Sequence, residues 1–277
     1  MRLAVLITCH NRREKTLACL DALFANHLPA NVSMHVILVD DGSTDGTSES
    51  VRARYPLVEM IQGDGNLYWN KGMHCAFGRA MEIGFDGYVW LNDDTVLYPS
   101  AIESLISTWQ EICAQRERPG IVVGSTQDPG TGSLTYGGVV AKSRLKLFRY
   151  TCVAPQPLPT ECHTMNGNCV LVPHEIAQVV GNLEAGFAHA MGDTDYGLRT
   201  RKAGFKLWIS SSFVGTCETN SAKGAFNDPA LPLSLRWERM MQPKGLPLAS
   251  WWLFTSRHGG LLWPLYFVWP YLRVVFR

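Results

Sequence analysis

Short apolar runs alternate with longer polar stretches along the first hundred residues of the chain. The runs are rich in Val, Ile and Leu and show no in-out alternation, so they predict strands that are buried on both faces. Between them, apolar residues recur at helical spacing. The predicted strands cover residues 3–8, 35–39, 57–61 and 88–91, and the predicted helices cover 17–24, the segment around Val51, and 70–83.

This strand-helix order predicts a mostly parallel sheet with right-handed crossovers, flanked by helices, as in Rossmann-related α/β folds. The polar segments that follow parallel strands gather at one edge of such a sheet, which is where ligands bind. We therefore expect four segments to converge, namely residues 8–12, 40–44, 63–66 and 92–94.

The pattern is more mixed after residue 100. A helix is predicted over 102–112, and strands over 121–124, 134–140, 169–172, 206–209 and 213–217. A further helix is predicted within 187–204, with Thr194 or Asp195 as its N-terminal cap. Asp195 and Arg199 are spaced to form a favourable i,i+4 pair in that helix.

Composition and charge exclude some classes of protein. The 277 residues carry 25 Lys and Arg against 24 Asp and Glu, a net charge of +1, which argues against nucleic-acid binding driven by charge. A hydrophobic fraction of 46% with 18% charged residues excludes wholesale disorder. The eight Cys are scattered without a paired framework, which predicts free thiols and a cytoplasmic location.

The C-terminal segment is rich in Trp, Tyr and Phe but is interrupted by Pro264, Pro270, Arg257 and Arg273. A membrane-spanning helix needs about 20 nearly uninterrupted apolar residues, so we do not expect one here. Two interpretations stay open: contact with a membrane interface, or a helical unit that packs on the core or on another subunit. We predict a catalytic domain over residues 1–225 and a helical extension over 226–277.

Two acidic pairs follow predicted strands. Asp93 and Asp94 repel each other, and a divalent cation with oxygen ligands would offset their charge, although a turn or helix cap is an alternative. Asp40 and Asp41 could accept hydrogen bonds from a nucleobase or a ribose, or could simply form a turn. Asp193 has no evident structural role, which makes it a candidate general base.

Other candidate chemistry is weaker. Adjacent strand-end residues point in opposite directions, so Cys9 and His10 are not expected to form a thiolate-imidazole pair. His10 is expected to contact a ligand base and Asn11 to tie its loop together. Cys162, His163 and Cys169 lack a second paired cluster, so zinc is not expected.

Four motifs together resemble the family 2 glycosyltransferases of GT-A fold: Thr-Cys-His-Asn-Arg at 8–12, Val-Asp-Asp-Gly-Ser-Thr-Asp-Gly-Thr at 39–47, Leu-Asn-Asp-Asp-Thr at 91–95 and Gly-Asp-Thr-Asp at 192–195. The resemblance covers residues 1–220, and Asn166 with Gly167 is similar to the rhamnosyltransferase-like branch. It implies an inverting enzyme that moves a sugar from a UDP- or dTDP-linked donor to a hydroxyl acceptor. A lipid-linked glycan at the inner face of the cell membrane, in bacterial surface polysaccharide or glycolipid synthesis, is the expected setting.

The resemblance also implies roles for individual residues. The nucleotide would be bound by Thr8, His10, Asn11, Asp40, Asp41, Asn66, Lys71 and Asp93, with Lys71 neutralising the diphosphate. Asp94 would bind Mg²⁺ or Mn²⁺, and Asp193 would be the catalytic base. Asn92 and Gly192 stand where relatives often have acidic residues, and Cys217 or Glu218 stands near the place of a third metal ligand.

Two other functions compete with this interpretation. A nucleotidyltransferase would also use a parallel sheet, a cation and a nucleotide, but it usually has a Gly-rich basic loop after the first strand, and residues 8–12 contain no Gly. A non-catalytic module that binds a sugar or a nucleotide would not need both Asp94 and Asp193.

Overall fold

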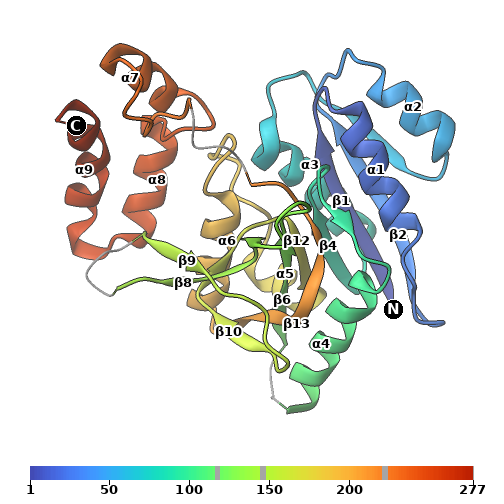
Figure 1. The fold of residues 1–277 in the computed structure, drawn as a ribbon. Helices are drawn as coiled ribbons and strands as arrows, with labels where there is room; N and C mark the ends of the chain where they lie inside the picture. The colour runs from blue at the N-terminus through green and yellow to red at the C-terminus, as the bar shows by residue number, and fades with distance from the viewer. Residues whose placement is uncertain (116–118, 144–147, 220–223, 277) are drawn as a thin grey trace.

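The strands of the chain are β1 (Arg2–Cys9), β2 (Ser33–Asp40), β3 (Glu59–Gln62), β4 (Gly87–Leu91), β5 (Val96–Leu97), β6 (Gly120–Gln127), β7 (Leu134–Tyr136), β8 (Gly138–Ala141), β9 (Tyr150–Cys152), β10 (Thr160–Cys162), β11 (Thr164–Met165), β12 (Cys169–Pro173) and β13 (Lys206–Thr216). The helices are α1 (Arg13–Phe24), α2 (Thr47–Arg54), α3 (Tyr68–Ile83), α4 (Ala101–Gln115), α5 (His174–Val180), α6 (Gly192–Lys202), α7 (Leu233–Met241), α8 (Leu248–His258) and α9 (Trp263–Val275). The computed structural model describes residues 1–115, 119–143, 148–219 and 224–276 (Figure 1).

A ten-stranded sheet forms the centre of the fold, with the path β10-β13-β6-β12-β4-β1-β2-β3. β1 pairs in parallel with β2 on one side and with β4 on the other, and β2 pairs in parallel with β3. β12 runs antiparallel between β4 and β6, whereas β13 pairs in parallel with β6. The prediction of a mostly parallel α/β sheet is therefore confirmed.

Helices cover both faces of this sheet, which explains why the central strands are apolar throughout. Residues Leu3–Ile7 of β1 have no solvent exposure. One apolar core joins the sheet to α1, α2 and α4, and a second joins its other face to α3, α5 and α6. Burial on both faces is the condition under which a strand loses its polar alternation.

A small second sheet has the order β11-β8-β9 and lies beside α6. Its central strand was predicted as part of a continuous strand over 134–140. The structure instead divides that segment into β7 and β8 at Gly137, whose φ of +158° lets the chain pass between two sheets. The strands predicted at 206–209 and 213–217 are one strand, β13, with register shifts along its pairing with β6.

The prediction of an N-terminal side-chain cap for α6 was wrong. This helix begins at Gly192, its N-cap residue is Met191 with φ +75°, and no side chain among the described residues caps it. Thr194 and Asp195 lie inside the first turn. The predicted i,i+4 pair is confirmed, because Arg199 Nε donates to Asp195 Oδ2 at 2.8 Å.

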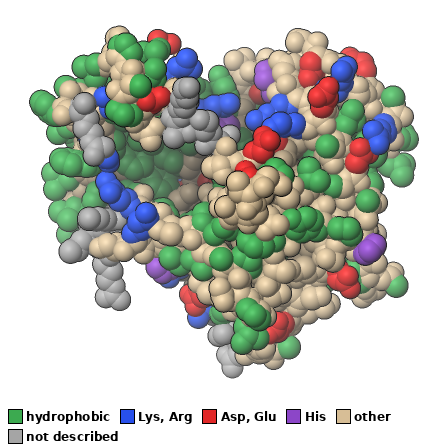
Figure 2. All heavy atoms as spheres, in the orientation of Figure 1, with side chains coloured by type: hydrophobic (Ala, Val, Ile, Leu, Met, Phe, Trp, Pro, Cys, Tyr) green, Lys and Arg blue, Asp and Glu red, His purple; other side chains and the backbone are tan. Residues whose placement is uncertain are grey.

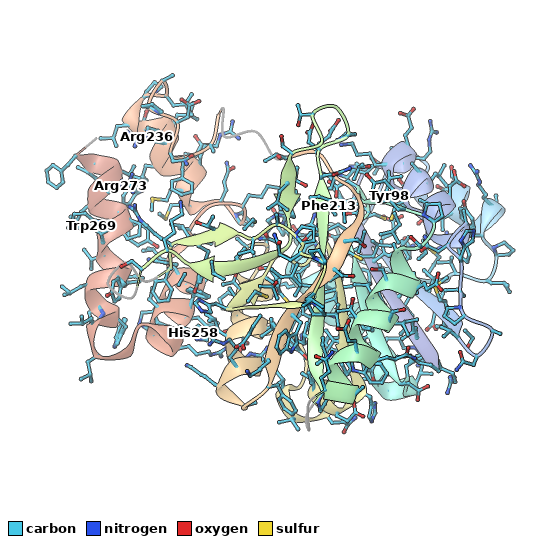
Figure 3. The ribbon with its side chains drawn as sticks, turned by 60° about the horizontal axis from the view of Figure 1, so that its bottom comes forward. Tyr98, Phe213, Arg236, His258, Trp269 and Arg273 are labelled. Carbon is cyan, nitrogen blue, oxygen red and sulfur yellow. The ribbon has the colours of Figure 1, made fainter. Side chains whose placement is uncertain are left out.

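The C-terminal extension consists of α7, α8 and α9, which stand to one side of the sheet (Figure 1). In the turned view, Arg236 marks α7, His258 marks the end of α8, and Trp269 and Arg273 mark α9 (Figure 3). Phe187 from the sheet part packs with Met240, Trp251, Phe254, Tyr271 and Val274 of the extension.

Within the described residues, no helix combines the length and the apolar character needed to cross a membrane. The domain boundary at residues 225 and 226 stays a prediction.

Candidate active site

The loop that follows β1 is tied to the loop that follows β2. Asn11, with φ +50°, accepts the Thr44 N–H through its Oδ1 at 2.7 Å and donates its own N–H to Ser43 Oγ at 2.8 Å. His10 Nδ1 donates to the backbone carbonyl of Asp41 at 2.5 Å. Two of the four predicted segments are therefore in direct contact, and His10 and Asn11 supply the contacts.

The two carboxylates at the end of β2 are buried and hold the backbone around them. Asp40 accepts the N–H of Ser43 at 3.0 Å and the hydroxyl of Ser48. Asp41 uses both oxygens for backbone groups in the third predicted segment and at the start of α3. Its donors are the N–H groups of Gly65, Leu67 and Tyr68 at 2.8, 3.0 and 2.9 Å. Asp41 thus fixes the path of the chain into α3.

The packing of α3 against the end of β1 depends on a glycine. A Cβ on Gly72 would lie 2.2 Å from Thr8 Oγ1, so the absence of a side chain allows the helix to approach the strand. Thr8 is buried at this contact. Lys71 precedes Gly72 in the first turn of α3 and is half-buried, whereas Asn66 is exposed in the loop before it.

Arg12 partly offsets the charge of the acidic pair that follows β4. Its Nη1 lies 3.1 Å from Asp93 Oδ1 and 2.8 Å from Asp94 Oδ2, so one guanidinium bridges both carboxylates. Burial raises the pKa of Asp93 to about 6, although the charge of Arg12 opposes that rise. The Arg12 side chain is 39% exposed, and it therefore presents a positive charge at the edge of the sheet where the predicted polar segments meet.

These residues fit a hard divalent cation through carboxylate oxygens. Asp94 is half-buried, and Asp93 Oδ2 is buried without a hydrogen-bond partner among the described residues. Across the described ranges, no group of three or more His, Cys, Asp and Glu side chains forms a metal cluster, so further ligands would have to come from the substrate or from water. Cys217 Sγ contacts Asp94 Oδ1 at 3.6 Å, while Glu218 pairs with Lys15 at 3.3 Å.

Trp69 lies between the residue before the acidic pair, Asn92, and the loop that contacts Asp193 on α6. The Trp69 indole N–H donates to Asn92 Oδ1 at 2.7 Å, and the Asn92 N–H donates to the carbonyl of Asn168 at 3.0 Å. Gly167 lies against the Trp69 ring, because a Cβ there would be 2.6 Å from Trp69 Cζ2. Asn92, at a position where relatives often have an acidic residue, thus accepts a hydrogen bond from the Trp69 indole.

Asp193 lies in the first turn of α6 with its carboxylate held by backbone groups. The Gly167 N–H donates to Asp193 Oδ2 at 3.0 Å, and the Thr194 N–H donates to Oδ1 at 2.6 Å. Burial raises the pKa of Asp193, and these hydrogen bonds oppose the rise without cancelling it. A carboxylate with a raised pKa accepts a proton more readily near neutral pH than an ordinary one.

The residue that precedes Asp193 is a glycine for a steric reason. A Cβ on Gly192 would lie 1.7 Å from Asn70 Oδ1, which leaves no room for any side chain. Asn70 is itself fixed, because its Nδ2 donates to the carbonyls of Glu184 and Phe187 at 2.8 Å each. The buried Asn70 therefore explains why no glutamate stands at residue 192.

The structure adds three residues that the sequence patterns did not single out: Arg12, Trp69 and Asn70. Arg12 belongs to the first polar segment and could have been noted as a cation near the predicted acidic pair. Trp69 and Asn70 carry no motif signal, since their partners are more than twenty residues away in sequence. Met191 and Tyr68 both have positive φ, and such strained backbone in non-glycine residues is often found at functional sites.

A family model described as glycosyl transferase family 2 matches residues 4–177 of the chain. Over 224 residues the chain is 28% identical to N-acetylglucosaminyl-diphospho-decaprenol L-rhamnosyltransferase of Mycobacterium tuberculosis strains CDC 1551 and H37Rv. This alignment covers 72% of the chain and 70% of the relative.

Solved structures of Staphylococcus aureus TarS have a similar fold. The structure of TarS residues 1–349 with UDP-GlcNAc has a TM-score of 0.59 at 12% identity and covers 92% of this chain and 71% of that chain. Another structure of residues 1–349 has a TM-score of 0.57 at 13% identity and covers 79% and 60%. A longer TarS structure has a TM-score of 0.59 at 11% identity, and there the chain spans 44% of the TarS chain.

Proposed function

The chain belongs to glycosyl transferase family 2 and is a glycosyltransferase, and we propose that it moves a sugar, with inversion, from a nucleotide-diphosphate sugar to a hydroxyl of a lipid-linked glycan. The relative from Mycobacterium tuberculosis is named for transfer of L-rhamnose to a diphospho-decaprenol-linked N-acetylglucosamine, which supports a lipid-linked acceptor. The TarS complexes with UDP and UDP-GlcNAc support a nucleotide-sugar donor. The reaction would serve bacterial surface polysaccharide or glycolipid synthesis.

Asp193 is the proposed general base. Its two oxygens are oriented by the N–H groups of Gly167 and Thr194, and its raised pKa suits it to take the proton of the acceptor hydroxyl. The hydroxyl oxygen then attacks the anomeric carbon as the bond to the nucleoside diphosphate breaks on the opposite face, which inverts the configuration. The orientation of this carboxylate is the observation that carries the proposal.

We assign the nucleotide to the edge where β1, β2 and the loop before α3 meet. Thr8, His10 and Asp41 would line the pocket of the base, and Asn11 and Asp40 support the loops that form it. Asn66 and Lys71 extend this surface along the start of α3, and Lys71 would face the diphosphate. Asp93 would complete the nucleotide site beside Asp94.

Asp94 would hold Mg²⁺ or Mn²⁺, with Asp93 next to it. When bound, the cation offsets the negative charge that develops on the departing diphosphate. Arg12 already contacts both carboxylates, and its guanidinium can turn toward the phosphate oxygens of the departing diphosphate. The protein thus carries a positive charge of its own at the leaving group.

The extension is the proposed site of contact with the inner face of the cell membrane. Its outer apolar side chains are exposed, with Leu261 at 99%, Leu265 at 68% and Trp269 at 61%. Leu265, Val268, Trp269 and Leu272 share one stripe of α9. Val268 and Trp269 lie three and four residues after Leu265, and Leu272 lies four residues after Val268 and three after Trp269. The opposite face of α9, with Tyr271 and Val274, packs within the extension, so the exposed stripe is the face that we propose for membrane contact.

The test is release of nucleoside diphosphate from a panel of nucleotide sugars in the presence of Mn²⁺ and a prenyl-diphosphate-linked N-acetylglucosamine acceptor. We expect transfer from a UDP- or dTDP-linked sugar, with the product of opposite anomeric configuration by NMR. Asp193→Asn should cut turnover by about 10²–10⁴-fold and leave nucleotide binding nearly unchanged. Full turnover in that variant would remove Asp193 from the role, and retained configuration would exclude the inverting mechanism.

A further inference from the structure

His189 lies in the loop that leads into α6, where the sheet part meets the extension. Its ring stands edge-on to the ring of Tyr68, the first residue of α3, with the centroids 6.4 Å apart and the planes at 84°. The charges of Lys244, in the loop between α7 and α8, and of Arg12 both act on the His189 ring. His189 is therefore near the nucleotide edge and near the extension, and it precedes Asp193 by four residues.

The loop that carries His189 is held on both sides of the ring. Phe187 and Met191 pack in the apolar cluster of the extension. The Phe187 carbonyl accepts a hydrogen bond from Asn70 Nδ2 at 2.8 Å, which joins the loop to α3. Met191 and Tyr68 have φ angles of +75° and +54°, so strained backbone occurs both in this loop and at the residue that the ring contacts. The packing of its neighbours thus fixes where the His189 ring lies.

One nitrogen of His189 has an unmet hydrogen bond. Nδ1 is buried and has no hydrogen-bond partner among the described residues. Burial lowers the pKa of His189 to about 4, so at neutral pH the ring is uncharged and offers one donor and one acceptor. A buried polar atom without a partner is costly in a folded protein, and a bound ligand can remove that cost. The residue as a whole is partly exposed, so a small movement of His189 or Tyr68 would open the ring to a ligand.

An uncharged imidazole beside an exposed aromatic ring suits a sugar. Tyr68 is 38% exposed. A pyranose has an apolar C–H face that packs on an aromatic ring, and hydroxyl groups at its rim that bond to polar side chains such as imidazole. A diphosphate would instead favour a cationic ring, and the ring of His189 is uncharged at neutral pH.

Of the two sugars in the reaction, the acceptor sugar fits this position better. In the proposed inversion, the acceptor hydroxyl approaches on the side of Asp193, opposite the diphosphate that leaves near Asp94. His189 belongs to the loop that precedes Asp193, and Phe187 and Met191 of that loop pack on the extension. Figure 2 shows a hollow between the C-terminal helices and the sheet part, and the contacts of His189 place it at the junction of these two parts.

We propose that Tyr68 and His189 form the subsite for the acceptor sugar. Tyr68 packs on the face of the sugar, and His189 hydrogen-bonds one of its hydroxyl groups, which directs the reacting hydroxyl toward Asp193. The assignment rests on the proposed function for the class of the acceptor, and it adds the residues that recognise the acceptor's sugar. Both side chains act by positioning, and the proton still goes to Asp193.

The first experiment follows the ring nitrogens of His189 by NMR in the full chain labelled with ¹⁵N-histidine, with His189→Gln to assign the resonances. The probe is benzyl N-acetyl-α-glucosaminide without donor, so the result does not depend on turnover. We expect this probe to shift the His189 resonances, and UDP with Mg²⁺ to shift them much less. A shift with UDP and none with the glucosaminide would assign His189 to the donor and overturn the proposal.

The second experiment measures KM for the prenyl-diphosphate-linked acceptor and Kd for UDP. His189→Ala and Tyr68→Leu should each raise the acceptor KM by about 10-fold, since each removes one contact to the sugar, and should leave the Kd for UDP nearly unchanged. Tyr68→Phe keeps the ring and should behave like the wild type. His189→Gln should lose less than His189→Ala, because an amide can still bond to a hydroxyl.

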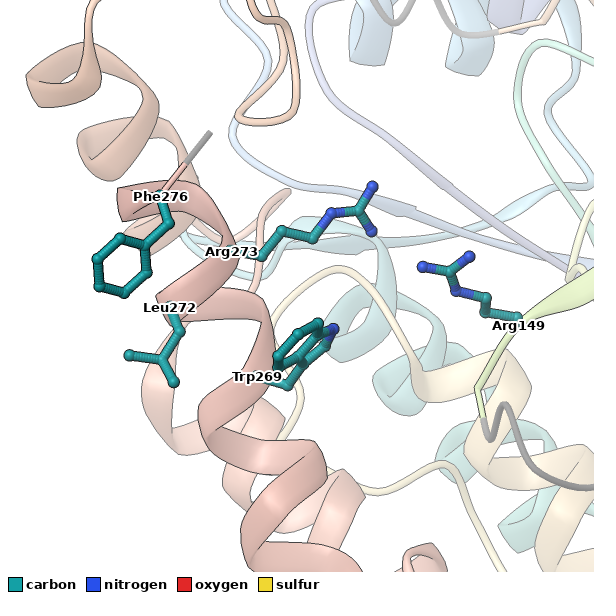
Figure 4. Close-up of a pocket in the computed structure, with 5 residues that line it drawn as sticks. All are labelled: Arg149, Trp269, Leu272, Arg273 and Phe276. Carbon is teal, nitrogen blue, oxygen red and sulfur yellow. The ribbon is translucent and has the colours of Figure 1, made fainter.

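Two exposed sites provide matched controls. His27→Gln controls for the loss of an imidazole. Phe276→Leu controls for the loss of an aromatic ring, because Phe276 is 82% exposed and lines a separate groove of about 590 Å³ with Arg149, Trp269, Leu272 and Arg273 (Figure 4). Binding of UDP reports that each variant is folded. An unchanged acceptor KM in His189→Ala and Tyr68→Leu would remove both residues from acceptor recognition, even if sugar transfer by the wild type is confirmed.

Discussion

Arg257 on α8 forms an ion pair with Asp195 on α6, with its Nη1 at 2.9 Å from Asp195 Oδ1 and 3.1 Å from Oδ2. Arg257 also donates to Glu184, and His258 Nε2 donates to Asp195 Oδ1 at 2.8 Å. Asp195 has no solvent exposure and lies two residues after Asp193. The extension is therefore attached to the helix that carries the proposed base.

Removing the charge of Asp195 should destabilise the protein. Its burial raises the pKa, but the hydrogen bonds from His258 and Arg199 and the charges of Arg199 and Arg257 outweigh that effect and keep the pKa below its ordinary value. Asp195→Asn leaves those donors buried without a counter-charge, so we expect the free energy of unfolding to fall by about 3–5 kcal/mol in urea titrations. Glu161→Gln, which breaks an exposed pair with Lys206, should cost less than about 1 kcal/mol. Equal losses in both variants would contradict this account.

Acidification should destabilise the protein through His189. Burial lowers the pKa of His189 to about 4, and the charges of Lys244 and Arg12 act in the same direction. Between pH 4 and its ordinary value of 6.5, the unfolded chain binds more protons at this ring, so the stabilisation is complete above 6.5 and is lost as the pH falls toward 4. His189→Gln should flatten this part of the curve of urea midpoint against pH. His27→Gln, at an exposed site, is the control and should leave the curve unchanged. If the slope of urea midpoint against pH is also unchanged in His189→Gln, His189 does not cause the acid destabilisation.

Gly167→Ala should slow sugar transfer more than it affects folding. The new Cβ would lie 2.6 Å from Trp69 Cζ2 and 3.4 Å from Asp193 Cβ, so Trp69 or the loop that orients Asp193 must move. A displacement near 1 Å at a reacting group costs about 10²-fold in rate, and we expect a fall in kcat of about that size with a smaller change in KM for the donor. Gly130→Ala, where the nearest atom to the new Cβ is at 3.5 Å, serves as the control. Wild-type kcat in Gly167→Ala would show that this contact does not position the base.

Removal of divalent cations should abolish transfer, and addition of Mg²⁺ or Mn²⁺ should restore it. Asp94 is the proposed ligand, so Asp94→Asn should need a much higher cation concentration for the same rate. The measurement is the initial rate after EDTA treatment, as a function of added cation. Full activity in EDTA would mean that Arg12, which already bridges Asp93 and Asp94, supplies the positive charge by itself.

Charged substitutions in the outer stripe of the extension should prevent membrane contact. The double variant Leu261→Glu with Leu265→Glu replaces two apolar side chains, which are 99% and 68% exposed, with acidic ones. We expect the wild type to float with vesicles that contain phosphatidylglycerol and the double variant to stay in solution. Leu57→Glu, at a site 87% exposed on the sheet part, should float like the wild type. Substitutions are preferable to truncation, because loss of α8 would also remove Arg257 from Asp195.

Much of the fold was predictable from the sequence because it depends on local patterns. The apolar runs before Thr8, Asp40 and Asn92 indicated buried parallel strands, and the polar residues after them marked the ligand edge. The sequence pattern predicted one strand over residues 134–140, whereas the structure shows the chain changing from one sheet to another at Gly137. The α6 cap was mispredicted because burial and ion pairing of Asp195 outweigh its preference for a helix terminus.

The sequence by itself determined the order of the strands and helices over the first hundred residues, the edge of the sheet where their polar segments lie and the acidic residues placed there, because hydrophobic periodicity and strand-end position are properties of neighbouring residues. Only the tertiary structure decided that Arg12 bridges Asp93 and Asp94, that Trp69 contacts Asn92, that Asn70 excludes a side chain at Gly192, and that His189 lies against Tyr68. These relationships join residues that are far apart along the chain. Their geometry depends on how the helices pack against the sheet, which no local pattern encodes.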